Sequence, residues 1–192
     1  GQRRLGLRTT ICRNATEMAL VWSMRKAGLS LLTGRPGPAK PVAFIEDAAV
    51  RPAQLPAYVA GLEGIMQPLG LEVCYYGHAA SGLLHVRPVL DLHRAVDLKK
   101  YRQVADEVAA LVRQFKGSLS AEHGVGMART EFMAAQFGPE LIEVMRARQR
   151  VFAPQTLFKP EKLHRAGRLR AASASRENFK RRIQKRRLDN TM

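Results

Sequence analysis

The stretch Leu71-Glu72-Val73-Cys74-Tyr75-Tyr76-Gly77-His78-Ala79-Ala80-Ser81-Gly82-Leu83-Leu84-His85-Val86-Arg87-Pro88-Val89 has two runs rich in apolar and aromatic residues around a turn of small residues. Two such runs on either side of a short, glycine-containing segment are typical of a β-hairpin. We therefore predict strands over residues 71–76 and 83–89, joined by a turn over residues 77–82. Because side chains alternate along a strand, Leu84 and Val86 should face one side of the sheet, and His85 and Arg87 the other side.

The segments around this hairpin predict an α+β fold. Their apolar spacing and turn residues indicate, in chain order, a loop (27–41), a strand (41–46), a helix (52–69), the hairpin, a helix (97–115), a short strand (118–121) and two helices (128–136 and 138–152). Gly70 and Gly117 are expected to end the two longer helices. The order β-α-β-β-α-β is that of a ferredoxin-like antiparallel sheet with both helices on one face. The opposite face, which carries His85, is expected to be open for a partner.

Two histidines flank the predicted turn, and the pair Glu122-His123 precedes Gly124-Val125-Gly126. The imidazoles of His78 and His85 with the carboxylate of Glu122 suit a divalent metal with open coordination positions. His123 is then available for proton transfer. The pattern alone leaves a second interpretation open, in which these are structural or surface histidines.

Several segments resemble, in the same order, the C-terminal domain of FAD-linked oxidases of the D-lactate and D-2-hydroxyglutarate dehydrogenase group. The resemblance covers about residues 22–163 and is greatest to the larger members that also carry an iron–sulfur half. The segments that carry it are Gly77-His78-Ala79-Ala80-Ser81-Gly82-Leu83-Leu84-His85-Val86-Arg87-Pro88, Ser120-Ala121-Glu122-His123-Gly124-Val125-Gly126, Phe137-Gly138-Pro139-Glu140-Leu141 and Val151-Phe152-Ala153-Pro154-Gln155-Thr156-Leu157-Phe158-Lys159-Pro160-Glu161-Lys162-Leu163.

The resemblance implies a set of site residues. They are metal ligands His78, His85 and Glu122, general base His123, substrate-carboxylate contacts Arg25, Lys40 and Arg87, and residues near the flavin Gly124, Gly126 and Lys159. The implied metal is Zn²⁺ or Mn²⁺, which would bind the hydroxyl and carboxylate oxygens of a small 2-hydroxy acid. His123 would take the hydroxyl proton while a hydride passes to FAD. The implied electron acceptor beyond the flavin is an iron–sulfur centre or a quinone.

Two positions depart from the common pattern of the group. Ala80-Ser81-Gly82-Leu83 stands where many members have Gly-Asp-Gly-Asn, so the turn lacks a carboxylate and an amide. Lys159 stands where members often have an Asn close to the flavin. The first difference bears on substrate preference and the second on the contact with the cofactor, whereas the metal ligands are unchanged.

Charge and composition suggest three regions in the 192 residues. The net charge of +16 is concentrated at the two ends, since residues 165–192 carry ten Lys and Arg against two acids and residues 1–26 carry six against one. We expect a truncated N-terminal segment (1–26), the substrate- and metal-binding domain (27–164) and a basic, disordered tail (165–192). The chain begins with Gly1, so we interpret it as a piece of a longer protein whose FAD-binding domain is absent here.

No apolar run has the length of a membrane span, and no signal peptide is evident. Cys12 and Cys74 are interpreted as free thiols in a reducing compartment. The expected location is the cytoplasm or the periphery of the inner membrane.

Two other functions stay open. A metal-dependent hydrolase would use the same histidines and carboxylate to activate water. A nucleic-acid-binding fragment would use the basic ends, but Phe179 is the one aromatic residue among the tail's basic residues, which argues against stacking on bases.

Overall fold

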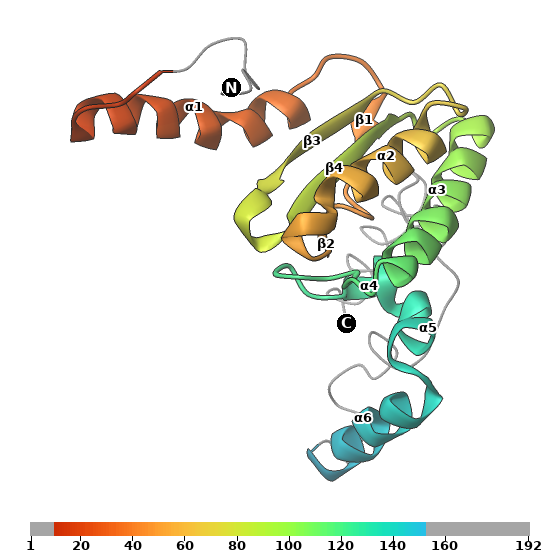
Figure 1. Ribbon diagram of the computed structural model, residues 1–192. Coiled ribbons are helices and arrows are strands. Elements are labelled where there is room, and N and C mark those ends of the chain that lie inside the picture. The colour runs from red at the N-terminus through yellow and green to blue at the C-terminus, as the bar shows by residue number, and fades with distance from the viewer. Residues whose placement is uncertain (1–9, 153–192) are drawn as a thin grey trace, which may run out of the picture. The chain divides into compact units, whose positions relative to one another are not determined.

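The structure is a computed structural model that describes residues 10–152 (Figure 1). The chain divides into two compact units, Gly1–Pro36 and Gly37–Met192. Lys159 and the predicted basic tail at residues 165–192 lie outside the described residues. Among the helices that are described, none has both the length and the apolar character needed to cross a membrane.

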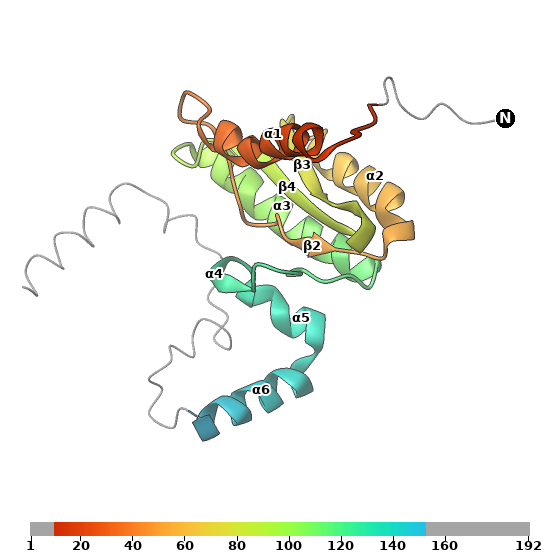
Figure 2. The ribbon, with the colours of Figure 1, turned by 90° about the vertical axis from the view of Figure 1, so that its left-hand side faces the viewer.

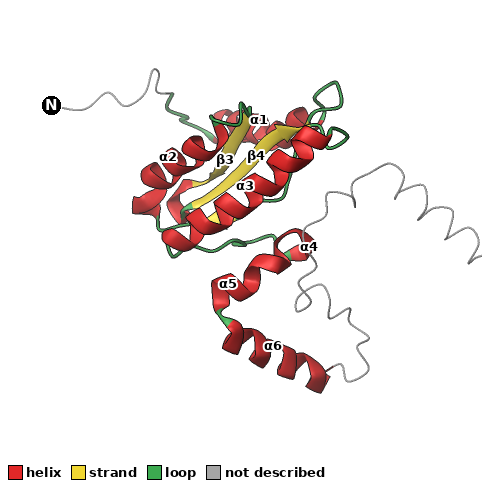
Figure 3. Cartoon of the chain, turned by 90° about the vertical axis from the view of Figure 1, so that its right-hand side faces the viewer, coloured by secondary structure: helices red, strands yellow, loops and turns green. Residues whose placement is uncertain are grey.

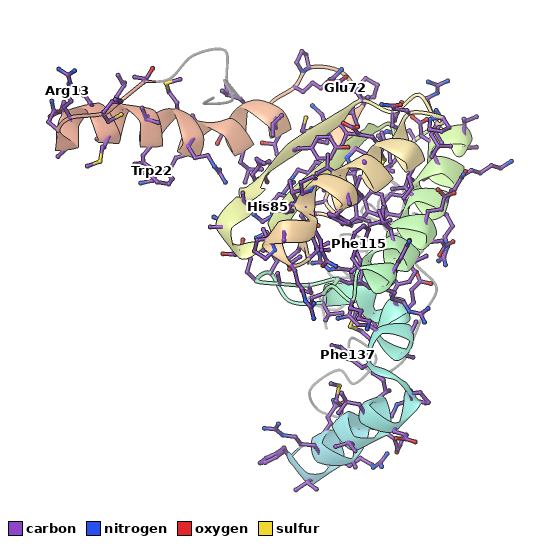
Figure 4. All side chains as sticks on the ribbon, viewed as in Figure 1. Arg13, Trp22, Glu72, His85, Phe115 and Phe137 are labelled. Carbon is purple, nitrogen blue, oxygen red and sulfur yellow. The ribbon has the colours of Figure 1, made fainter. Side chains whose placement is uncertain are left out.

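The first unit contains one helix, α1 (Ala15–Thr33), within the described residues. The side chain of Asn14 accepts a hydrogen bond from the backbone N–H of Glu17 (2.9 Å), which satisfies a free donor in the first turn of the helix. The predicted loop at residues 27–41 is wrong over residues 27–33, because alanine and leucine there favour a helix and the interior Gly28 is tolerated. Trp22 projects from α1 (Figure 4) and is 61% exposed.

The second unit is built on a four-stranded antiparallel sheet: β1 (Lys40–Pro41), β2 (Ala48–Ala49), β3 (Val73–His78) and β4 (Leu83–Leu90). β4 pairs with β3 along one edge and with β1 and β2 along the other. The predicted hairpin is confirmed, with Tyr76 opposite His85 and His78 opposite Leu83. A short 3-10 helix, η2 (Ala79–Ser81), and Gly82, whose φ of 72° is left-handed, complete its turn.

The predicted strand at residues 41–46 is shorter than expected, because β1 ends at Pro41. Pairing stops after the backbone N–H of Val42 donates to Pro88 (2.9 Å), and the chain then turns before β2 begins. The turn brings Glu46 and Asp47 into the interior, where they are 6% and 0% exposed. These residues form a buried polar turn instead of continuing the strand, and the turn lies beside the candidate site.

The predicted strand at residues 118–121 is reduced to a single bridge between Ser118 and Ala49. The N–H of Ala121 donates to both the backbone carbonyl and the carboxylate of Asp47, and the N–H of His123 donates to the carboxylate, so regular strand pairing does not continue. The α+β class and the antiparallel sheet are therefore confirmed. The ferredoxin-like order stays a prediction, because its fourth strand is represented by this bridge alone.

Two helices, α2 (Leu55–Met66) and α3 (Ala95–Gln114), lie side by side over one face of the sheet (Figures 1 and 3). A 3-10 helix, η1 (Pro52–Gln54), leads into α2. The core between helices and sheet contains mostly aliphatic and aromatic side chains with almost no exposure, among them Phe44, Tyr58, Leu62, Met66, Val86, Leu90, Val104, Val108 and Val112. The predicted apolar faces of both helices are confirmed by this packing.

The ends of α2 and α3 have the same hydrogen-bond pattern. Gly70 (φ 61°) follows α2, and the N–H of Leu71 donates to the carbonyl of Met66 (3.2 Å), as expected for a glycine that ends a helix. After α3 the left-handed residue is Lys116 (φ 51°), and Gly117 follows it. The predicted stop at Gly117 is thus displaced by one residue.

The remaining described residues form short helical segments after the loop that follows Ser118 (Figure 2). They are α4 (Gly126–Arg129), the 3-10 helix η3 (Thr130–Phe132), α5 (Met133–Phe137) and α6 (Pro139–Phe152). The single helix predicted over residues 128–136 is therefore divided into three segments. The predicted helix at Pro139 is confirmed, and Ile142 is its buried residue.

Candidate functional site

The β3–β4 hairpin brings His78 and His85 together. Their ring centroids are 5.7 Å apart, and the ring planes are nearly perpendicular at 81°. The side chain of His78 is half exposed at the end of β3, whereas His85 is only 3% exposed. His85 lies on the sheet face opposite Val86, as predicted, but this face is not open at His85. The backbone carbonyl of Glu46 and the side chains of Glu122 and His123 contact His85 there.

Asp47 fixes the loop that carries Glu122 and His123. Its carboxylate accepts hydrogen bonds from the Ser120 hydroxyl (2.9 Å) and from the backbone N–H groups of Ala121 (2.9 Å), Glu122 (3.2 Å) and His123 (2.9 Å). Burial alone would raise the pKa of Asp47, but the donors from His123, Ser120 and Glu122 outweigh burial and hold the pKa below its usual value. Asp47 is therefore an ionised anchor for the loop.

Three imidazoles surround one carboxylate oxygen of Glu122. Its Oε1 lies 3.2 Å from Nε2 of His85, 3.5 Å from Nε2 of His123 and 3.7 Å from Nε2 of His78. The histidines come from β3, β4 and the loop, and Figure 4 shows His85 at the end of the sheet that this loop approaches. The predicted ligands and the predicted base are thus adjacent in space.

The other ring nitrogens of His85 and His123 are held by one residue. Nδ1 of His85 lies 2.8 Å from the backbone carbonyl oxygen of Glu46, and Nδ1 of His123 lies 3.3 Å from Oε1 of the Glu46 side chain. A carbonyl and a carboxylate only accept hydrogen bonds, so Nδ1 is the donor in both of these contacts; Nε2 of His123 lies farther from its carboxylate, at 3.5 Å from Glu122. In the neutral imidazoles, Nε2 therefore presents a lone pair toward Glu122.

This arrangement of acceptors fits a cation. In its neutral form His85 directs a lone pair at a carboxylate oxygen 3.2 Å away, which is unfavourable unless a positive charge lies between them. Ligand atoms of Asp47, His85, Glu122 and His123 lie within 4.8 Å of one another. The loop donors of Asp47 converge on its Oδ2, so this carboxylate already holds the loop. His85 and Glu122, with the exposed His78 beside them, therefore fit a divalent metal best.

Of the residues predicted to contact substrate, Arg87 lies on the same face as His85, two positions along β4. Its Nε donates to the hydroxyl of Tyr76 (3.0 Å), whose ring is 4.8 Å from that of His85. Lys40 is exposed and pairs with Leu90, at the end of β4 farthest from the hairpin turn. Arg25 lies in α1, within the first unit.

Gly124 and Gly126 follow His123 with φ values of 76° and 56°. Apart from the adjoining residues, no atom of the described part of the chain lies within 4 Å of the position that a Cβ would take at either glycine. The prediction that backbone here passes close to a cofactor is compatible with this space and stays a prediction.

Sequence reasoning missed Glu46, Asp47 and Arg129. Arg129 is 7% exposed, and its guanidinium contacts Oε2 of Glu46 (3.3 Å) and the carbonyl oxygens of Gly124 (2.8 Å) and Val125 (3.2 Å). One sequence feature pointed to the acidic pair, which stands between the apolar runs Val42–Ile45 and Ala48–Val50. Acidic residues in such a context are buried only where they have partners.

Comparison with known proteins points to one family. Residues 2–163 match the C-terminal domain of FAD linked oxidases. A D-2-hydroxyglutarate dehydrogenase of Escherichia coli is 35% identical over 153 residues, which are 80% of this chain and 15% of that protein. A D-2-hydroxyglutarate dehydrogenase of Pseudomonas putida is 35% identical over 154 residues, with the same coverage. A glycolate oxidase subunit GlcD of Bacillus subtilis is 26% identical over 124 residues, or 65% of this chain and 26% of that protein.

Proposed function

Because the chain belongs to the FAD-linked oxidases, as the C-terminal domain of that family, we propose that it is the substrate- and metal-binding part of an FAD-dependent D-2-hydroxy-acid dehydrogenase. The proposed reaction oxidises a D-2-hydroxy acid, such as D-lactate or D-2-hydroxyglutarate, to the 2-oxo acid. The chain spans about 15% of the length of the D-2-hydroxyglutarate dehydrogenases it matches. The whole reaction therefore requires an FAD-binding domain that works together with this chain.

One observation carries the proposal: Nε2 of three histidines converges within 3.2–3.7 Å of a single oxygen of Glu122. Nδ1 of His85 donates its proton to the backbone carbonyl of Glu46, so Nε2 is free to act as a metal ligand. Two imidazoles and a carboxylate leave coordination positions free for the oxygens of a substrate.

His78, His85 and Glu122 would hold the metal, with Zn²⁺ or Mn²⁺ as the proposed ion. Such an ion would supply a positive charge that lowers the pKa of a bound hydroxyl group. His123, with its proton on Nδ1 and its Nε2 turned to the same point, would take the hydroxyl proton as general base. The carbon–hydrogen bond electrons would leave as a hydride to FAD, which is a chemistry that the cofactor supplies.

Further roles follow the same proposal. Arg87 would bind a substrate carboxylate, since it shares the sheet face of His85 and a guanidinium pairs well with a carboxylate. Contacts of Arg25 and Lys40 with the substrate, and of Gly124, Gly126 and Lys159 with the flavin, are proposed from the family resemblance. An iron–sulfur centre or a quinone is the proposed electron acceptor.

The test is reconstitution. The metal content of the purified chain is measured first, and the chain is then combined with the FAD-binding domain of a related dehydrogenase under anaerobic conditions. We expect flavin bleaching on addition of a D-2-hydroxy acid, and none with the L-enantiomer. A chain that binds metal and the FAD domain but leaves the flavin oxidised with every D-2-hydroxy acid supplied would overturn the proposal.

A further inference from the structure

We propose that Glu46 is a positioning residue that sets the proton position on both active-site histidines, and that Arg129 fixes which way its carboxylate faces. The inference rests on the proposed function for the role of His123 as general base. The hydrogen-bond geometry itself is independent of that role.

The backbone of Glu46 determines which ring nitrogen of His85 carries the proton. Its carbonyl oxygen lies 2.8 Å from Nδ1 of His85, in surroundings where the imidazole is 3% exposed. Since the carbonyl only accepts, the proton of the neutral ring is on Nδ1 and the lone pair is on Nε2. No substitution of the Glu46 side chain removes this contact.

The side chain of Glu46 determines which ring nitrogen of His123 carries the proton. Oε1 lies 3.3 Å from Nδ1 of His123, and Oε2 lies 3.3 Å from Nη1 of Arg129. The carboxylate is 8% exposed, and the guanidinium that faces it is 9% exposed. Each oxygen thus has one donor, and the two donors lie on different sides of the carboxylate.

Because the two oxygens of Glu46 have different donors, a glutamine at position 46 can be accommodated in only one orientation. An arginine can only donate, so in Glu46→Gln the amide oxygen must face Arg129 and the amide NH₂ must face His123. Nδ1 of His123 would then have to accept, and its proton would move to Nε2, which faces Glu122. The substitution keeps the size and the Arg129 contact, but it removes the lone pair that a general base at Nε2 needs.

The experiment is ¹⁵N NMR of the full chain with labelled histidine, without metal and over a series of pH values. Two-bond and three-bond ¹H–¹⁵N correlations identify which ring nitrogen carries the proton. In the parent chain we expect both His85 and His123 protonated on Nδ1. In Glu46→Gln we expect His123 to change to the Nε2-protonated form while His85 stays unchanged, which makes His85 an internal control.

Two variants complete the design. Glu46→Asp keeps two acceptor oxygens, so His123 should keep its proton on Nδ1, and this variant also serves if Glu46→Gln does not fold. Glu107→Gln removes a partly exposed carboxylate of α3, whose hydrogen-bond partner is Gln103, and should change neither histidine. His123 remaining protonated on Nδ1 in folded Glu46→Gln, or losing that proton in folded Glu46→Asp, would refute the proposal.

The positioning role of Glu46 and the proposed dehydrogenase function can be refuted independently of each other. If the chain reconstitutes as a dehydrogenase, Glu46→Gln should lower turnover by about 10–100-fold, the usual effect of a residue that orients a functional histidine. With metal in excess, the metal content should stay at the parent level because none of the proposed ligands His78, His85 and Glu122 is substituted. A changed His123 proton position without any reconstituted activity, in the parent or in the variant, would keep the positioning role and reject the dehydrogenase. Unchanged turnover in a variant whose His123 proton has moved would reject the catalytic importance of the positioning.

Discussion

The imidazole rings of His85 and His123 are stacked with their centroids 5.0 Å apart and their planes within 4° of parallel. One ring comes from β4 and the other from the loop after Ser118, so their alignment depends on tertiary structure. Both rings have Nδ1 on Glu46 and Nε2 toward Glu122. Two nitrogens that face the same point from parallel rings form a preorganised pair, in which one can bind a cation and the other can accept a proton.

The metal ligands can be tested on the chain alone. His78→Ala removes an exposed imidazole whose Nε2 is 3.7 Å from Glu122, so folding should be unaffected and metal affinity should fall by about 10-fold or more. The control is His93→Ala, since His93 is similarly exposed and interacts with Asp91. Elemental analysis after dialysis should find about one ion per chain in the parent and in His93→Ala, and much less in His78→Ala. Equal metal content in all three would exclude His78 as a ligand.

Substitution of His123 distinguishes proton transfer from metal binding. In a reconstituted dehydrogenase, His123→Ala should lower turnover by about 10²–10⁴-fold, the usual contribution of a general base. Metal content should stay close to that of the parent, because His85 and Glu122 retain their contact. Rapid-mixing measurement of flavin reduction would show the effect directly. Near-normal reduction in this variant would mean that another group takes the proton.

The sequence was sufficient for the hairpin, whereas the approach of Glu122 to its histidines was expected from a fourth strand that the structure reduces to a single bridge. Two apolar runs around a glycine-rich turn have few alternatives, and His78 and His85 at the two ends of that turn had to lie close together. The same reasoning placed His85 on the face opposite Val86, which is correct.

The turn that contains Glu46 and Asp47 could not be derived in the same way. The run Val42–Ile45 has strand propensity, and propensity predicted a strand through Glu46. The strand does not continue because, in the folded state, four donors from residues 120–123 bind the carboxylate of Asp47 and the guanidinium of Arg129 binds that of Glu46. Such partners are distant in sequence, so local pattern contains no information about them. The extension of α1 through residues 27–33 was missed because the glycine and proline residues of this region were weighted above its alanine and leucine.

Asp91 gives a prediction on pH at the entrance to α3. The backbone N–H and the imidazole of His93 donate to its carboxylate (3.0 and 2.9 Å), and these bonds hold the pKa of Asp91 below its usual value of 3.8. The folded chain therefore binds fewer protons at this site than the unfolded chain does. The resulting stabilisation is complete above pH 3.8 and is lost as the pH falls through the folded-state pKa.

An NMR titration of the Asp91 carboxyl in the parent chain and in His93→Ala measures this shift. We expect a lower pKa in the parent, and a rise toward the usual value in the variant although the backbone donor remains. The same pKa in both chains would show that the imidazole contributes nothing.

Tyr58 provides a test of the core. Its ring is 0% exposed and meets Phe115 edge to face at 5.7 Å, but its hydroxyl has no hydrogen-bond partner within the described part of the chain. Burial raises the pKa of this phenol. Because an unpaired buried hydroxyl is unfavourable, Tyr58→Phe should leave the free energy of unfolding unchanged or raise it by about 1 kcal/mol. Tyr58→Ala should lower it by about 3–5 kcal/mol through the cavity it creates. Urea unfolding would measure both, and a loss of more than about 1 kcal/mol in Tyr58→Phe would reveal a bridging water.

Gly82 links the geometry of the hairpin turn to the candidate metal centre. Its φ of 72° is left-handed, and a Cβ there would overlap the carbonyl oxygen of Val50, whose own N–H donates to Gly82 (3.0 Å). Gly82→Ala should therefore destabilise the chain by at least about 1–2 kcal/mol from backbone strain alone. It should also weaken metal binding, because relief of the overlap moves the turn that sets the distance between His78 and His85.

The matched control is Gly64→Ala in α2. Gly64 has a right-handed backbone conformation and open space around the position of a Cβ, so alanine should raise the free energy of unfolding by about 0.5–1 kcal/mol. Denaturant unfolding and metal titration on both variants separate the two effects at Gly82. Weak metal binding with unchanged stability would mean that the turn moves without strain. Lower stability with parent-like metal affinity would mean that the two histidines keep their spacing independently of this glycine.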